Sequence, residues 1–379
     1  MPLHPDDPAL DAWLRLAATP GVGPQRLQVL LQAAGDPERA LRLSRAALAA
    51  LPGVGPRLAE RVQAQNGPAA RAAADGWRRT LARLGALVVV PTEPAYPADF
   101  RQVDEPPLLL FVCGRLEVLQ APAVALVGTR YPTAYGRQVA RAFAQDFARA
   151  GVAVVSGMAR GIDAAAHTAA LEAGGPTIGV LGHGIDRVYP SELAPLFARM
   201  RRDGLLLTEF FPGEPPLAAH FPRRNRLIAA LARAVVVVEM GQKSGAQHTV
   251  EHALRLGRDV FAVPGPVTSP ASSGTNQLLK DGAQVATAAA DVLVALGEAA
   301  PTWEEEPAVA PGAVTAVPDG LPPLARRLLE VLAGAESRHI DELVVEVGRP
   351  APEVLASLLE LELEGWVASR PGGRYARAR

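Results

Sequence analysis

Short runs of β-branched and other apolar residues recur through the middle of the chain, and segments with helical spacing of apolar positions separate several of them. Helices are predicted at residues 136–150 and 245–256. Strands that alternate with helices indicate a doubly wound, mainly parallel sheet with both faces covered, which we assign to a domain at residues 84–298. We expect strands at residues 86–90, 108–112, 123–127, 152–155, 177–181, 205–208, 234–239 and 259–263.

The sequence before this sheet repeats itself. Residues 19–24 read TPGVGP, residues 51–56 read LPGVGP, and each copy precedes a helical pattern. Glycine permits a tight turn and proline is favoured at the start of a helix, so we expect a pair of helix-hairpin-helix units in a SAM-like helical domain at residues 1–83. Backbone N–H groups at such a turn could hold a DNA phosphate, and the turn could equally contact only protein.

A different pattern follows the sheet. Residues 299–320 are rich in proline and glutamate and have no periodicity, which is typical of a linker. Residues 321–379 contain helical patterns at 324–332, 340–347 and 352–364, and then two short strands around the turn Arg370-Pro371-Gly372-Gly373. This order predicts a winged helix.

The expected recognition helix of that domain, residues 352–364, carries four glutamates and no basic residue. A helix that reads the major groove normally carries arginine, lysine, asparagine or glutamine. We therefore expect the winged helix to be mainly a protein-interaction or self-association module. A weak contact with the DNA backbone stays open because arginines lie in the wing and tail, at Arg370, Arg374, Arg377 and Arg379.

Composition narrows the class of protein but does not identify a partner. No apolar run is long enough to span a bilayer, and the N-terminus lacks the basic start and apolar stretch of a secretory signal. Cys113 is the only cysteine, so an internal disulfide is excluded and we expect a cytoplasmic protein. The net charge is −1, although residues 111–300 carry 18 basic against 15 acidic residues.

Ligands of a doubly wound sheet bind at the carboxyl ends of its strands, so the turns that follow the strands carry the candidate site residues. The turn at residues 127–130, VGTR, lacks the pattern G-x-G-x-x-G, and we expect no dinucleotide cofactor. The turn at residues 156–163, SGMARGID, leads into a helix that carries His167. Asp163 and His167 share a face of this helix, but a helix-dipole partner and a core histidine are favoured over acid–base catalysis.

A third turn provides the clearest local signal for nucleic-acid binding. Residues 221–226 read FPRRNR and begin a helix, where arginine is otherwise electrostatically unfavourable. The arginines and the first N–H groups of the helix could hold phosphates, and Phe221 offers a face on which a base could stack. The alternative for Phe221 is packing in the core.

Together these segments resemble the DNA-processing protein A (DprA/Smf) family, in order and over nearly the whole central domain. The resemblance implies an extended Rossmann-like domain that binds single-stranded DNA, dimerises and interacts with the RecA recombinase. It implies protection of incoming DNA and its delivery to RecA in natural transformation. The segments that carry the similarity are 127–130, 135–136, 156–163, 166–167, 180–186, 189–190, 209, 221–228, 238–239, 244–245, 257–265, 274–276 and 282–283.

From the turns and the resemblance together we predict a DNA-binding site without a cofactor, a metal or enzymatic activity. We further expect Arg130, Arg223, Arg224, Arg226 and Lys243 to line one groove, because all of them follow strands of the sheet. The complete predicted set is Gly128, Arg130, Ser156, Gly157, Phe221, Arg223, Arg224, Asn225, Arg226, Lys243, Ser244 and Gly245.

The sequence departs from the family pattern in two places. The serine common before Tyr135-Gly136 is replaced within Pro132-Thr133-Ala134, and the segment after Ser244-Gly245 reads AQHTV where small apolar residues are usual. The second departure creates H-x-x-E-H at residues 248–252, a formal match to a zinc motif. Because the motif is short and its distal carboxylate cannot be assigned, we expect no zinc site here.

Two other functions remain as alternatives. A nucleotide phosphoribohydrolase has a similar fold, but it would need a P-G-G-x-G-T-x-x-E turn, which the corresponding loop lacks. A scaffold protein without a ligand site is the other alternative.

Overall fold

The computed structural model describes residues 2–242, 244–297, 321–333, 337–363, 366–370 and 374–377. The chain divides into two compact units at residue 301, and each is described by itself. The expected linker at residues 299–320 lies outside the described residues, as does Lys243. Within the described ranges, no helix is long and apolar enough to cross a membrane.

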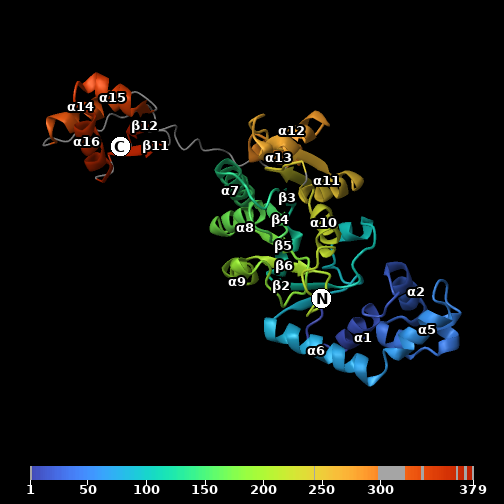
Figure 1. Cartoon of the computed structure of the whole chain (residues 1–379). Coiled ribbons are helices and arrows are strands. Elements are labelled where there is room, and N and C mark those ends of the chain that lie inside the picture. The colour runs from blue at the N-terminus through green and yellow to red at the C-terminus, as the bar shows by residue number, and fades with distance from the viewer. Residues whose placement is uncertain are drawn as a thin grey trace. The chain divides into compact units, whose positions relative to one another are not determined.

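The first unit is built on a sheet with the strand order β1-β2-β6-β5-β4-β3-β7-β8-β9. Figure 1 labels β2, β6, β5, β4 and β3 of this sheet. Neighbouring strands from β6 to β9 are parallel, and β1 and β2 form an antiparallel margin against β6. The expectation of a mainly parallel, doubly wound sheet is confirmed. The strands are β1 (Leu87–Val89), β2 (Leu110–Gly114), β3 (Ala123–Val127), β4 (Ala153–Ser156), β5 (Thr177–Val180), β6 (Leu205–Thr208), β7 (Ala234–Val237), β8 (Asp259–Ala262) and β9 (Gln284–Val285).

Helices cover both faces of this sheet because successive side chains of a strand point to opposite faces. In β3, Val124 and Leu126 pack into one apolar cluster, and Ala125 and Val127 pack into another. Figure 1 shows α7, α8 and α9 on one side of the strands and α10 and α11 on the other. The covering helices are α7 (Ala134–Arg149), α8 (Ile162–Glu172), α9 (Ala194–Asp203), α10 (His220–Leu231), α11 (Ala246–Arg255), α12 (Ser273–Lys280) and α13 (Ala289–Ala295).

The order of the strands reverses beside β3. The chain proceeds from β3 through β4 and β5 to β6, and then returns to place β7 on the other side of β3. In doubly wound sheets, ligands bind in the crevice at the carboxyl ends of the strands where this reversal occurs. The sheet therefore places the turns after β3, β4 and β7 around one crevice.

The N-terminal part is helical, and the expected pair of helix-hairpin-helix units is confirmed. Arg26 joins the two glycine turns, since its Nε donates to the carbonyl of Gly53 and its Nη1 to that of Gly21, both at 2.8 Å. Trp77 packs on Phe211 of the sheet domain, with ring centres 4.6 Å apart. The helices are α1 (Pro8–Ala17), α2 (Pro24–Ala34), α3 (Pro37–Arg42), α4 (Arg45–Ala49), α5 (Gly55–Ala64) and α6 (Pro68–Leu84). Whether the glycine turns bind DNA or protein stays a prediction, as does the domain boundary at residue 83.

The second unit is a winged helix, as predicted. Its helices enclose an apolar core that includes Leu328, Leu343 and Leu358, and its strands pair in the order β10-β12-β11. Glu364, residues 371–373 and Arg379 lie outside the described residues. The elements are α14 (Pro323–Leu332), β10 (Arg338–His339), α15 (Ile340–Val347), α16 (Ala351–Leu363), β11 (Val367–Arg370) and β12 (Arg374–Arg377).

Candidate nucleic-acid interface

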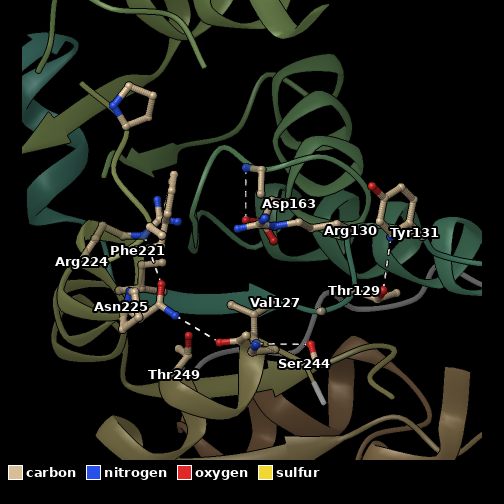
Figure 2. Close-up of a pocket in the computed structure, with 18 of the residues that line it drawn as sticks. Val127, Thr129, Arg130, Tyr131, Asp163, Phe221, Arg224, Asn225, Ser244 and Thr249 are labelled. Carbon is tan, nitrogen blue, oxygen red and sulfur yellow. Dashed lines mark hydrogen bonds between the residues drawn. The ribbon is translucent and has the colours of Figure 1, made fainter. Parts of the chain in front are cut away.

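A groove of about 700 Å³ opens at the crevice beside β3. The turn after β3, the start of α10 and the segment that leads into α11 all contribute to its lining. Figure 2 shows Arg130 and Tyr131 on one side, facing Phe221, Arg224 and Asn225 on the other. Side chains from distant parts of the chain therefore meet where the topology predicts a ligand site.

Aromatic rings border this groove beside an exposed guanidinium. The ring centre of Phe221 lies 5.5 Å from the guanidinium carbon of Arg130 and 5.8 Å from the ring centre of Tyr189. Phe221 is half-buried, whereas Tyr131 at the rim is 79% exposed. A cation beside partly open rings suits a chain of phosphates and bases, because phosphate binds the cation and bases stack on the rings.

Tyr131 and Tyr189 were not among the predicted site residues. They lie in turns far apart in sequence, and a lone tyrosine in a turn carries no local signal that distinguishes a ligand contact from an exposed side chain. Both tyrosines line the groove together with Phe221 because the fold brings their turns together at the crevice.

Arg224 lies beneath the groove and is only 4% exposed. Its Nη1 donates to the carbonyl of Gly157 at 2.6 Å and also to the carbonyl of Val180, and its Nε donates to Oδ1 of Asn225 at 3.1 Å. Burial lowers the pKa of Arg224 to about 10, and nearby Asp163 opposes this shift. Several N–H groups of the guanidinium thus donate to acceptors inside the protein, although the residue still lines the groove.

Asp163 completes this buried arrangement at the start of α8. Its carboxylate accepts the N–H groups of Gly157 at 3.1 Å and Ala159 at 3.3 Å, and burial raises its pKa. A Cβ at Gly157 would lie 2.6 Å from Nη2 of Arg224 and 2.9 Å from Oδ2 of Asp163, so only glycine fits between them. Arg224 and Asp163 together hold the turn that follows β4.

The prediction that the basic residues line one groove is wrong for Arg223 and Arg226. Both pair with the buried carboxylate of Glu209, at 2.9 Å from Arg223 and 2.6 Å from Arg226, and each borders a different cavity. A helix turns by about 100° per residue, so positions three apart share a face and position 224 points elsewhere. Arg226 is 6% exposed, and Arg223, at 52%, keeps an open side. Their contact with DNA stays a prediction.

The remaining predicted residues divide between the groove and the structure below it. Gly128, Ser244 and Gly245 line the groove, and Nδ2 of Asn225 donates to the carbonyl of Gly245 at 3.2 Å, which joins α10 to the start of α11. Ser156 is fully buried, and its hydroxyl donates to the carbonyl of Leu126 at 2.7 Å. Ser156 and Gly157 therefore shape the turn under the groove rather than its open surface.

His167 is a core residue, as the sequence interpretation favoured. Its Nδ1 lies 2.7 Å from Oγ1 of Thr177, and the ring is fully buried. Burial and the nearby Arg224 charge lower its pKa to about 3. The imidazole is therefore neutral at physiological pH and enclosed away from any substrate.

A buried carboxylate occupies the start of α7, the helix that follows β3. Glu239 is 2% exposed and accepts the N–H of Thr133 at 2.8 Å and the hydroxyl of Thr133 at 2.7 Å. A Cβ at Gly136 would lie 2.4 Å from Oε2 of Glu239. The hydroxyl of Thr133 also caps the helix through the N–H of Gly136, so threonine supplies here the hydroxyl cap that serine would give. The position that would hold a nucleotide phosphate in many doubly wound folds is filled by the protein's own anion.

The H-x-x-E-H segment lies on α11. Nδ1 of His248 is 3.7 Å from Oε2 of Glu251. In the described part of the chain, no group of three or more histidine, cysteine, aspartate or glutamate side chains could hold a metal ion.

Comparisons with known proteins identify similar chains and families. A family model described as DNA recombination-mediator protein A matches residues 87–297, and one described as DprA winged helix domain matches residues 312–373. A SAM-like helix-hairpin-helix tandem model matches residues 14–65. The chain is 39% identical over 379 residues to a putative DNA processing protein DprA of Mycobacterium tuberculosis, with 97% of this chain and 94% of that protein covered.

Solved structures show the same relationship. The X-ray structure of DNA processing protein A from Streptococcus pneumoniae has a TM-score of 0.64 and 32% identity, and the match covers 75% of this chain and 97% of that chain. DNA processing protein A from Helicobacter pylori, described for its unique single-stranded DNA binding mode, has a TM-score of 0.51 and 30% identity. That match covers 55% of this chain and 95% of the Helicobacter chain.

Proposed function

Because the chain belongs to the DNA recombination-mediator protein A (DprA/Smf) family, we propose that it binds single-stranded DNA in the groove beside β3. The observation that carries this proposal is the exposed Arg130 beside the partly open rings of Phe221, Tyr131 and Tyr189. The single-strand binding described for the Helicobacter relative supports it.

In this proposal the open and buried residues of the groove have different tasks. Arg130 binds a backbone phosphate, and Tyr131 and Phe221 offer faces to unpaired bases. Residues at the starts of α10 and α11 line the same groove, and the positive end of a helix dipole favours negative charge. Arg224 and Asp163 are positioning residues, since they hold the β4 turn and Arg224 uses donors on carbonyls of the protein.

We extend the proposal to the role expected for the family. The protein protects incoming single strands in the cytoplasm and delivers them to the RecA recombinase during natural transformation. It does so as a homodimer formed through the central domain, because two linked grooves bind one long strand with avidity. Light scattering of the full chain should report twice the monomer mass at micromolar concentration, and a monomer there would contradict the dimer.

A nucleotide phosphoribohydrolase fits the groove less well. Such an enzyme would need a phosphate seat beside a placed carboxylate, and the start of α7 instead holds Glu239. A second anion at this seat would be repelled by the buried carboxylate. We therefore propose a non-enzymatic role, and we prefer binding to a pure scaffold function because the groove combines a cation with open aromatic faces.

Fluorescence anisotropy tests the proposal together with an assay for nucleotide hydrolysis. A labelled oligothymidylate should bind the full chain more tightly than a duplex of equal length, and nucleoside monophosphates should remain intact. Hydrolysis of a monophosphate would establish the enzymatic alternative. An absence of both hydrolysis and single-strand binding would favour the scaffold.

A further inference from the structure

The helix in the recognition position of the winged helix, α16, presents apolar side chains to solvent. On its inner face Val354, Leu358 and Leu361 are buried in the domain core. On its outer face Leu355 is 45% exposed and Leu359 is 57% exposed.

These exposed residues form a continuous stripe. A helix turns by about 100° per residue, so Leu355, Ala356 and Leu359 project from the same side. Ala356 is exposed as well. A surface helix normally has one apolar and one polar face, and a helix that is apolar on both sides is usually covered by a partner. The outer stripe of α16, formed by Leu355, Ala356 and Leu359, is therefore a surface without an evident role in folding the domain.

Acidic side chains lie beside this outer stripe, on the side of Ala356. Glu353 and Glu360 are both exposed next to it, and Arg349 lies 3.7 Å from the Glu353 carboxylate at the start of the helix. The preceding helix, α15, also carries exposed carboxylates, at Asp341 and Glu342. Within α16 there is no lysine or arginine to offset these charges.

The charges distinguish between the classes of partner. A DNA duplex would bring phosphates against Glu353 and Glu360, and like charges at close range cost binding energy. A two-fold pairing of α16 with a second copy would bring the acidic flanks of both helices together. A segment with an apolar stripe flanked by basic residues satisfies both the apolar centre and the acidic margins, which is the usual form of helix-in-groove and helix–helix recognition.

We propose that the outer stripe of α16 docks an amphipathic helix of another protein, in which basic residues flank an apolar stripe. This surface is separate in sequence from the DNA groove and does not depend on the proposed DNA-binding function. The winged helix is then a protein-recognition module rather than a reader of duplex DNA.

Synthetic helical peptides can test this docking with the full chain. The probe is a labelled peptide of about 18 residues, long enough for several helical turns, with leucines on one face and arginines beside them. The first comparison peptide has glutamates in place of the arginines, and the second has the probe's composition in scrambled order. Anisotropy should show binding of the arginine peptide at least about tenfold tighter than either comparison, which corresponds to about 1.4 kcal/mol.

Two variants connect the binding to this surface. Leu359→Asp should weaken binding of the arginine peptide by about tenfold or more, while Leu254→Asp, at an exposed apolar position on α11, should leave it unchanged. Circular dichroism should give both variants the thermal midpoint of the parent protein, since both side chains are exposed. The double variant Glu353→Arg with Glu360→Arg should reverse the preference in favour of the glutamate peptide.

Several outcomes would overturn the proposal. Equal binding of the arginine and glutamate peptides, or binding of neither, would remove the charged partner that we infer. An unchanged preference in the charge-reversed variant would do the same. Loss of self-association in Leu359→Asp, measured by sedimentation, would assign the surface to a second copy, and loss of duplex binding would assign it to DNA.

Discussion

Nη1 of Arg224 donates to the carbonyl of Gly157 at 2.6 Å, beneath the groove rather than into it. This contact ties the start of α10 to the turn after β4, two segments that are distant in sequence. One of the arginines that were predicted to bind phosphates therefore holds the site in shape. The exposed Arg130 lines the groove, where DNA can reach its guanidinium.

Replacement of Arg224 should clearly lower the free energy of unfolding. It should change the salt dependence of DNA binding only a little. Arg224→Ala removes the attraction of the guanidinium for the buried Asp163 and takes a buried donor from the carbonyls of Gly157 and Val180. Each buried polar group left without a partner costs about 1–3 kcal/mol. Urea denaturation measures the loss. Arg224→Lys should recover only part of it, because an ammonium cannot reproduce the geometry of the guanidinium. A stable Arg224→Ala protein with weakened DNA binding would instead make Arg224 a direct contact.

Replacement of Arg130 should have the opposite signature. Arg130→Ala should leave the unfolding free energy almost unchanged, because the side chain is exposed. It should reduce the slope of log affinity against log salt by roughly 0.7 on an oligothymidylate, as expected for one lost phosphate contact. Arg141→Ala is the matched control, since the Arg141 side chain is 42% exposed but pairs with Glu172 away from the groove. Equal effects of the two substitutions would point to general charge rather than to the groove.

The aromatic rim should contribute to affinity without adding to the salt dependence. Tyr131→Ala and Phe221→Ala should each cost about 1–3 kcal/mol of single-strand binding if a base stacks on each ring. Tyr131→Phe should bind almost like the parent protein, because the ring is retained. Anisotropy gives the affinities and thermal unfolding provides the control. For Phe221, a greater loss of stability than of affinity would identify it as a packing residue.

The buried His167 should make the protein less stable in mild acid. Its folded-state pKa of about 3 lies below the ordinary value of 6.5, so below pH 6.5 the unfolded chain binds a proton that the native protein does not. The contribution of His167 to the free energy of unfolding is thus fully present above about pH 6.5 and is lost as the pH falls toward 3. At pH 5 the loss from this group is roughly 2 kcal/mol. Urea denaturation at pH 7.5 and pH 5 should show this fall, and His167→Gln should have a shallower one. An identical fall in the variant would assign the pH dependence to other groups.

Much of the fold follows from local patterns in the sequence. The short apolar runs at residues 123–127 and 205–208 became β3 and β6 with the expected bounds, because a buried parallel strand needs apolar side chains on both faces. The helix expected at residues 340–347 also has these bounds as α15. The two-residue strand β9 was not predicted, since a pair of residues carries no period.

The candidate site was only partly predictable. The turn after β3 and the segment that begins α10 were singled out correctly as groove lining, because the carboxyl ends of parallel strands define where a ligand binds. The buried contacts of Ser156 and Arg224 were not predicted. The hydrogen bonds between Glu239 and Thr133 at the start of α7 were not predicted either. Each depends on a partner far away in the chain, with which a local motif has no fixed spacing.

The sequence by itself determined which segments form strands and helices, their order and the turns that surround the crevice, because hydrophobic period and turn residues act over a few positions. Only the tertiary structure decided which arginines face the groove. Arg223 and Arg226 turn toward Glu209, whereas Arg224 turns toward Gly157. The rotation of α10 on the sheet sets these directions, and that rotation results from packing against residues remote in sequence, such as those of β3 and β4.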